Sequence, residues 1–185
     1  MAGRSARNRD RGHDVTPRAP PWFAEVGQPL AQPVRALAES MRHAIATIAR
    51  QDVEYVADWR AAATILHAID ADGVWWDAEE AERAWLWERA AERLGEADVA
   101  ARLAAIAGRL AEPCAVAALA AMAKAGIADP ALARAAAGAA QIAAQQRELA
   151  ALAGEARAHF FEFKHALFAA GRWPLGNLRG AFRVF

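Results

Sequence analysis

The sequence predicts an all-α protein, a single-domain bundle of about six helices with a long C-terminal helix and a short irregular or β-like C-terminal tail. Three observations support this fold class. Alanine, the strongest helix former, supplies 54 of the 185 residues. Residues that favour strands, such as valine, isoleucine, threonine and tyrosine, are few. Apolar stripes at helical spacing alternate with short Asp, Gly and Pro segments that end one helix and begin the next.

Residues 1–21 differ in composition from the rest of the chain. They are polar and arginine-rich and they close in prolines, which is typical of a disordered lead. A nucleic-acid-binding tail is the alternative interpretation of their five arginines. We expect one folded domain over residues 22–185, a length that suits a single core.

The first two helices are predicted over residues 34–50 and 52–69. Leu37 and Met41 belong to the apolar stripe of the first helix. Asp52 stands where it could cap the second.

The next helix is predicted over residues 78–94 and holds the densest group of large and charged side chains in the chain. Asp77 takes the N-cap position. Trp87 lies on the apolar seam of this helix and is expected to face the core. Trp75 and Trp76 precede the cap and are expected to brace the helix entry.

Two short helices, over residues 99–110 and 113–126, are predicted before a long one over residues 130–170. The long helix is expected to kink or break near Gly138 or Gly154, because glycine weakens a helix. Its apolar stripe is close to heptad spacing, so it would form either the spine of the bundle or the seam of a homodimer.

The C-terminal tail is the one segment where a short strand is predicted, because residues 181–185 alternate between the two faces of a strand. Its aromatic side chains are expected to fold back over the bundle. Arg172, Arg179 or Arg183 would then reach the acidic helix.

The charge of the chain excludes some partners. The formal net charge is zero, so no overall field attracts nucleic acid or an anionic membrane. Residues 71–96 carry eight acidic side chains against three arginines, whereas residues 130–185 carry seven basic against three acidic side chains. These two regions are therefore expected to lie near each other in the fold.

Several features predict a cytoplasmic protein without a membrane span. Cys114 is the only cysteine, so the chain cannot form an intrachain disulfide. No signal peptide is recognisable, and no run of 18 uninterrupted apolar residues occurs. Arginine outnumbers lysine by 20 to 2, which indicates GC-rich coding of the kind found in bacteria.

One surface is predicted to meet a protein partner. Trp85 is two residues from Trp87, so it points to the other side of the helix, where Glu88 and Glu92 are its neighbours. Trp85 either packs beneath another element of the chain or stands as an exposed anchor for a partner, since tryptophan is frequent at binding hot spots.

One group of residues resembles a metal site in its spacing. Glu155, His159, Glu162 and His165 would share one side of a continuous helix. The pair Glu162 and His165 has the Glu-x-x-His spacing of di-iron helical bundles, but the sequence contains no second copy. The other interpretation is a solvated polar edge.

Motifs for other chemistry are missing from the sequence. Neither a glycine-rich phosphate loop nor a serine nucleophile elbow occurs, and we expect no cofactor. The sequence thus predicts a non-enzymatic protein-binding helical protein, of the antitoxin or immunity type, which uses Trp85, Glu88 and Glu92. The alternative is a metal-dependent helical-bundle enzyme that uses Glu155, His159, Glu162 and His165.

Overall fold

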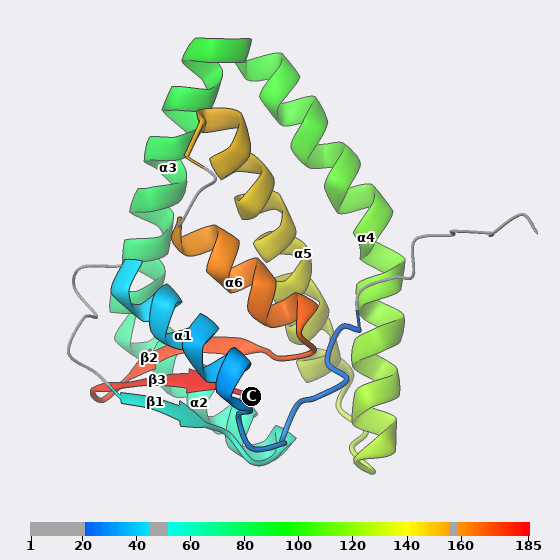
Figure 1. Cartoon of the computed structure of the whole chain (residues 1–185). Helices are drawn as coiled ribbons and strands as arrows, with labels where there is room; N and C mark the ends of the chain where they lie inside the picture. Colours follow the sequence, from blue (N-terminus) through cyan, green and yellow to red (C-terminus); the bar gives the residue numbers. More distant parts are fainter. Residues whose placement is uncertain (1–20, 45–51, 156–158) are drawn as a thin grey trace, which may run out of the picture.

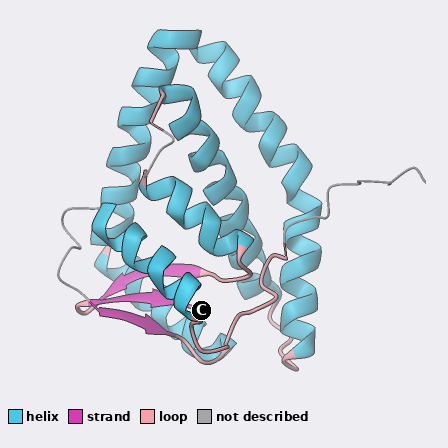
Figure 2. Cartoon of the chain, in the orientation of Figure 1, coloured by secondary structure: helices cyan, strands magenta, loops and turns pink. Residues whose placement is uncertain are grey.

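The computed structural model describes residues 21–44, 52–155 and 159–185. This part of the chain forms six helices and a three-stranded sheet (Figures 1 and 2). The elements are α1 (Gln32–Ala44), β1 (Asp52–Tyr55), α2 (Trp59–Asp72), α3 (Val74–Leu94), α4 (Glu96–Lys124), α5 (Pro130–Ala153), α6 (Phe160–Ala169), β2 (Pro174–Leu178) and β3 (Ala181–Val184). The prediction of a mainly helical fold is confirmed, and the β-like C-terminal tail is part of a small three-stranded sheet that an all-α bundle does not contain.

The sheet joins the first and last parts of the fold. Its order is β1-β3-β2, with β1 parallel and β2 antiparallel to β3. The C-terminal strand was predicted, whereas the helix predicted from Asp52 is wrong: Asp52 pairs with Ala181 in β1. Helix α2 instead begins at Trp59, where the Asp58 side chain accepts a hydrogen bond from the Ala61 amide.

Helix α3 begins earlier and presents a different face than the sequence predicts. It starts at Val74, so Asp77 lies in its first turn and does not cap it. Its buried side chains are those of Trp75, Glu79, Leu86 and Ala90. Trp87 is only half-buried, because the inner face is turned by one residue from the predicted seam.

Helix α4 is one helix of 29 residues and contains Pro113 in its interior, so the predicted break into two helices is wrong. Pro113 is exposed, and its ring can therefore be accommodated on the outer side of the helix. Helix α4 packs along α5. Among the described residues it alone is long and apolar enough to cross a membrane, by length and composition only. A single such helix is weak evidence for a span.

The predicted long C-terminal helix starts as expected but divides into α5 and α6. Asp129 caps α5 by accepting from the amides of Ala131 and Leu132. The helix ends at Gly154, which is left-handed with φ 87°. A Cβ there would lie 2.6 Å from Nη1 of Arg93, so the guanidinium would have to shift to admit a side chain. The stripe that suggested a homodimer seam therefore does not run along one helix.

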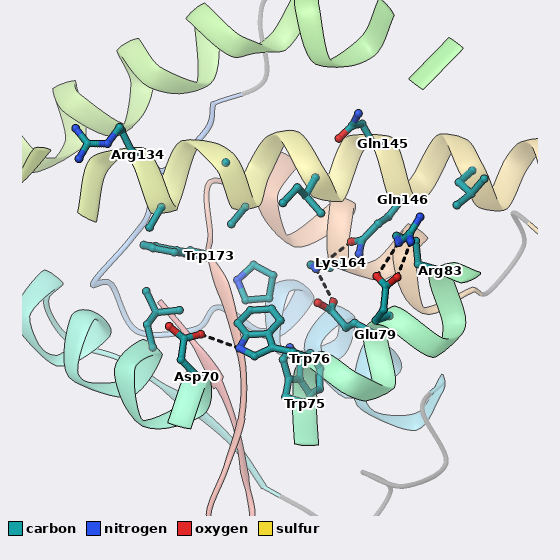
Figure 3. Close-up of a pocket in the computed structure, with 18 of the residues that line it drawn as sticks. Asp70, Trp75, Trp76, Glu79, Arg83, Arg134, Gln145, Gln146, Lys164 and Trp173 are labelled. Carbon is teal, nitrogen blue, oxygen red and sulfur yellow. Dashed lines mark hydrogen bonds and ion pairs between the residues drawn. The ribbon is translucent and has the colours of Figure 1, made fainter. Parts of the chain in front are cut away.

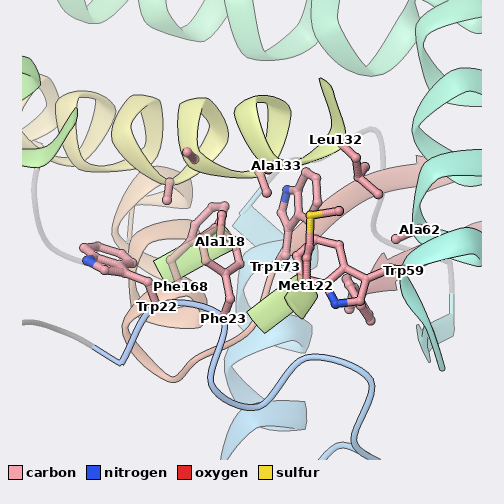
Figure 4. Close-up of a cluster of buried hydrophobic side chains, with 14 of the residues drawn as sticks. Trp22, Phe23, Trp59, Ala62, Ala118, Met122, Leu132, Ala133, Phe168 and Trp173 are labelled. Carbon is pink, nitrogen blue, oxygen red and sulfur yellow. The ribbon is translucent and has the colours of Figure 1, made fainter. Parts of the chain in front are cut away.

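The core has two clusters of buried side chains that α5 connects. The first gathers Trp22, Phe23, Trp59 and Trp173 beside α5 (Figure 4). The second gathers residues of α1, α3, α5, α6 and the sheet around Phe182, which is fully buried. Alanines form most of the buried face of α5, so neighbouring elements can approach its backbone closely.

Candidate functional site

A cavity of about 760 Å³ opens between α2, α3, α5, α6 and the start of β2 (Figure 3). Three indoles line it, those of Trp75, Trp76 and Trp173, together with aliphatic side chains. We call it the tryptophan-lined cavity. Its volume falls within the roughly 300–1,000 Å³ that is usual for small-molecule sites.

A buried polar cluster forms part of the cavity wall. The Lys164 ammonium, from α6, donates to Oε1 of Glu79 in α3 at 2.5 Å and to Oε1 of Gln146 in α5 at 2.9 Å (Figure 3). Lys164, Glu79 and Gln146 are each at most 5% exposed. A buried charge is costly unless it is paired and hydrogen-bonded, so each group holds the others in place.

The aromatic walls are fixed by their own contacts. The Trp76 indole N–H donates to Oδ1 of Asp70 at 2.8 Å. Trp75 packs against Phe160 and Phe182 at ring-centroid distances of 5.7 and 5.6 Å. Gly176 faces the Trp75 indole so closely that a Cβ would lie 3.0 Å from it. A ligand would therefore meet walls that are already shaped.

Arg83 and Arg134 lie at opposite ends of the cavity (Figure 3). Arg83 pairs with Glu80 at 2.5 Å, and its hydrogen bonds hold the pKa of the Glu80 carboxyl below its usual value. Arg134 is exposed and has no ion-pair partner within the described ranges. The rim thus offers one cation that is free to meet an anionic group.

A second hollow, of about 770 Å³, lies between the N-terminal loop and the end of α4. Its charged side chains are less suited to binding a ligand. The Asp58 carboxylate already caps α2, and Lys124 is exposed to solvent. The tryptophan-lined cavity is the stronger candidate since it combines apolar walls with a buried charged cluster.

The predicted partner surface lies elsewhere on α3. Trp85 is 41% exposed, and the Arg89 guanidinium lies over its ring at 4.8 Å. Glu88 and Glu92 are exposed beside it. The structure therefore keeps these three side chains together and accessible.

The C-terminal tail does not cover that surface, so the predicted contacts of its arginines with the acidic helix are wrong. Arg172 donates to the backbone carbonyls of Gln28 and Pro29, and Arg183 pairs with Glu54 of β1. The acidic helix instead meets α6 through the ion pair between Glu79 and Lys164, which confirms that the two regions are neighbours.

The four residues with metal-site spacing do not converge. Glu155 pairs with Arg89 at 3.0 Å, and Glu162 pairs with Arg147 at 2.9 Å. His159 contacts Glu82 at 2.8 Å, and the His165 ring packs against Trp22. The spacing brings the four residues together only on one continuous helix, but α5 ends at Ala153 and α6 begins at Phe160. Within the described residues, no three His, Cys, Asp or Glu side chains lie where they could hold a metal ion.

Sequence reasoning missed the residues of the buried cluster, although a signal for them exists. Glu79 lies four residues after buried Trp75 and seven before buried Leu86, on the inner face of α3. Lys164 lies between Phe160 and Leu167 on the inner face of α6. Opposite charges at inward positions of two helices indicate a buried pair.

Cys114, the single thiol, is fully buried in α4. Burial raises the pKa of this thiol to about 11, which keeps it protonated and unreactive near neutral pH. The tryptophan-lined cavity thus remains the best candidate for chemistry or binding.

Comparison with protein-family models, with characterised proteins and with solved structures finds no significant match to this chain.

Proposed function

We propose that this protein binds a small, largely apolar organic molecule in the tryptophan-lined cavity. The observation that carries the proposal is the buried cluster of Lys164, Glu79 and Gln146 in the wall of an otherwise mostly apolar cavity. Ligand sites typically combine apolar walls with a few convergent polar groups. The indoles would hold a flat apolar body, and the polar cluster would orient a polar group.

Binding of the fluorescent probe 8-anilinonaphthalene-1-sulfonate tests this proposal. Leucine in place of Gly138 would narrow the cavity, because Gly138 lines it and a Cβ there meets no atom within 4 Å. Gly108→Leu is the matched control, since Gly108 lies in α4 outside the cavity and is equally free of contacts. Both changes favour the helix by up to about 1 kcal/mol, so neither should unfold the protein.

The expected result is saturable binding of one probe molecule to the wild type and to Gly108→Leu. The dissociation constant should rise by about tenfold or more in Gly138→Leu, because the side chain occupies the site. Equal affinity in all three proteins would place the probe outside this cavity and contradict the proposal.

Binding of a protein partner through Trp85, Glu88 and Glu92 is a second candidate function. The exposure of Trp85 to 41% favours it, because a large exposed aromatic beside charged groups resembles a binding hot spot. An antitoxin or immunity-type role in the cytoplasm would use such a surface against a basic partner.

Capture of a stoichiometric partner from a lysate of the source organism tests this second function. Trp85→Ala and the paired change Glu88→Gln with Glu92→Gln should each lose the partner. Val116→Ala, a change at an exposed site on α4, should retain it. Full capture by the Trp85 and glutamate variants would exclude this surface.

A further inference from the structure

Lysine is rare in this chain, which makes its use in the cavity informative. The sequence contains 20 arginines and two lysines. Lys124 is exposed, whereas Lys164 is 5% exposed and lines the tryptophan-lined cavity. The buried cation of the cavity is thus a primary amine, in a chain where 20 of the 22 lysine and arginine side chains are guanidinium groups. Only the amine can become a nucleophile, because arginine keeps its proton in proteins.

The contacts of Lys164 suit a reaction at its nitrogen. Two of the three ammonium hydrogens are directed to Glu79 and Gln146. The Glu79 carboxylate, at 2.5 Å, is close enough to accept a proton directly. The Gln146 amide holds the nitrogen in position and carries no charge.

We propose that Lys164 forms an imine with an apolar or aromatic aldehyde held in this cavity, an inference that rests on the ligand-binding function proposed above. Glu79 takes one proton from the ammonium, and the free amine adds to the carbonyl carbon. A C–N bond forms as the π bond of the carbonyl breaks, and one hydrogen of the added amine moves to the carbonyl oxygen, which becomes a hydroxyl. Glu79 then returns its proton to that hydroxyl, which leaves as water.

The charge balance of the buried pair favours this product. Ammonium plus aldehyde gives a protonated imine plus water, so one positive charge lies beside the Glu79 carboxylate both before and after the reaction. The pair that stabilises the free protein is therefore retained, and no unpaired charge is left in the low-dielectric wall. The three indoles would hold the aryl group of the aldehyde.

Reductive trapping with 2-naphthaldehyde and cyanoborohydride tests the inference, with peptide mass mapping as the readout. Reduction converts an imine into a stable naphthylmethyl amine on the lysine. We expect labelling at Lys164 to exceed labelling at Lys124 by about tenfold or more, because the cavity holds the aldehyde next to the amine. The exposed Lys124 serves as an internal control in the same molecule.

Variants show whether labelling of Lys164 depends on the cavity or only on the reactivity of any lysine amine. Lys164→Arg keeps the charge but cannot form an imine, so it should lose the label. Gly138→Leu should reduce the label by narrowing the cavity, and Lys124→Arg should leave labelling at Lys164 unchanged. The mapping of the wild-type protein decides the matter even if Lys164→Arg does not fold.

Displacement of 8-anilinonaphthalene-1-sulfonate by 2-naphthaldehyde distinguishes ligand binding in the cavity from imine formation at Lys164. Displacement with selective labelling at Lys164 supports both. Displacement without label, or with equal labelling of both lysines, overturns the imine and leaves the binding function standing. No displacement at saturating aldehyde overturns the imine, whereas the binding function is overturned by equal probe affinity in wild type and Gly138→Leu.

Discussion

At the scale of single residues, the buried pair of Lys164 and Glu79 has the largest expected effect on stability. Lys164→Met keeps much of the side-chain volume but leaves the Glu79 carboxylate buried without its cation. Loss of one partner of a buried pair typically costs about 3–5 kcal/mol. We therefore expect a loss of that size in the free energy of unfolding, measured by urea denaturation.

The double change Lys164→Met with Glu79→Leu is the control for this prediction. It removes both charges, and a buried pair replaced by apolar residues is often neutral for stability. The double variant should therefore regain most of the loss. A single variant that loses less than about 1 kcal/mol would mean that water reaches the carboxylate and solvates it.

His165 gives the stability a dependence on pH. Its ring is partly buried against Trp22, and desolvation, with a further contribution from Arg147, lowers its pKa against the opposing effect of Glu162. The folded state therefore binds fewer protons than the unfolded state as the pH falls below the unfolded value of 6.5. Its contribution to stability is full above that pH and is lost as the pH falls through the folded-state pKa.

Comparison of wild type with His165→Gln isolates this contribution, because every other titratable group is shared. Urea denaturation between about pH 7.5 and pH 5.5 covers the window in which histidine titrates. The wild type should lose more stability over that range than the variant. Parallel losses in the two proteins would show that the protonation of His165 is not coupled to folding.

The buried pair of Glu79 and Lys164 also shows how much of the candidate site could be predicted from the amino-acid sequence. Charge density drew attention to Trp85, Glu88 and Glu92, because exposed charge is abundant on α3. Glu79 belongs to the same acidic run, and the composition of the run does not distinguish it from its neighbours. Its role follows from the phase of the helix and from a partner 85 residues later in the chain. That partner is identified only once α3 and α6 are packed together.

At the scale of elements, capping residues predicted those helix boundaries that depend on contacts between neighbours in the sequence. The start of α5 depends on Asp129 and Pro130, which act through their own backbone. Strand β1 was missed because Asp52 looks like a helix cap, and its strand partner Ala181 lies at the other end of the chain. Strand pairing between such distant segments leaves little trace in a local pattern.

Pro113 predicted a break between two helices, but α4 continues through it. Within α4 it removes one backbone donor and crowds the preceding turn. Because Pro113 is exposed, Pro113→Ala removes little packing and should raise the free energy of unfolding by about 1–3 kcal/mol. The exposed neighbour Glu112 supplies the control, and Glu112→Ala should stay within about 0.5 kcal/mol of wild type. Lower stability of Pro113→Ala would contradict this expectation.

At the scale of the whole molecule, the small sheet joins the N-terminal and C-terminal parts of the described chain. Strand β3 pairs with β1 on one side and β2 on the other, while α5 contributes to both core clusters. The clusters therefore share one helix, and Trp75 joins the sheet to the cavity through its contact with Phe182. Loss of the sheet should consequently disturb the cavity as well as the base of the molecule.

Deletion of residues 181–185 tests this coupling. It removes the central strand and three side chains that are at most 1% exposed, those of Phe182, Val184 and Phe185. Each large buried aromatic is worth about 3–5 kcal/mol, and natural domains hold only about 5–15 kcal/mol in all. The truncated protein should therefore lose its cooperative thermal transition in circular dichroism.

Arg183→Ala is the matched control within the same strand. Its pair with Glu54 lies near the surface, with side chains 23% and 51% exposed, and such pairs contribute at most about 1 kcal/mol. This variant should melt cooperatively, close to wild type, and should still bind 8-anilinonaphthalene-1-sulfonate in the cavity. A truncated protein that melts and binds like Arg183→Ala would mean that the helices hold the cavity without the sheet. The cavity would then depend on the packing of α3, α5 and α6 alone.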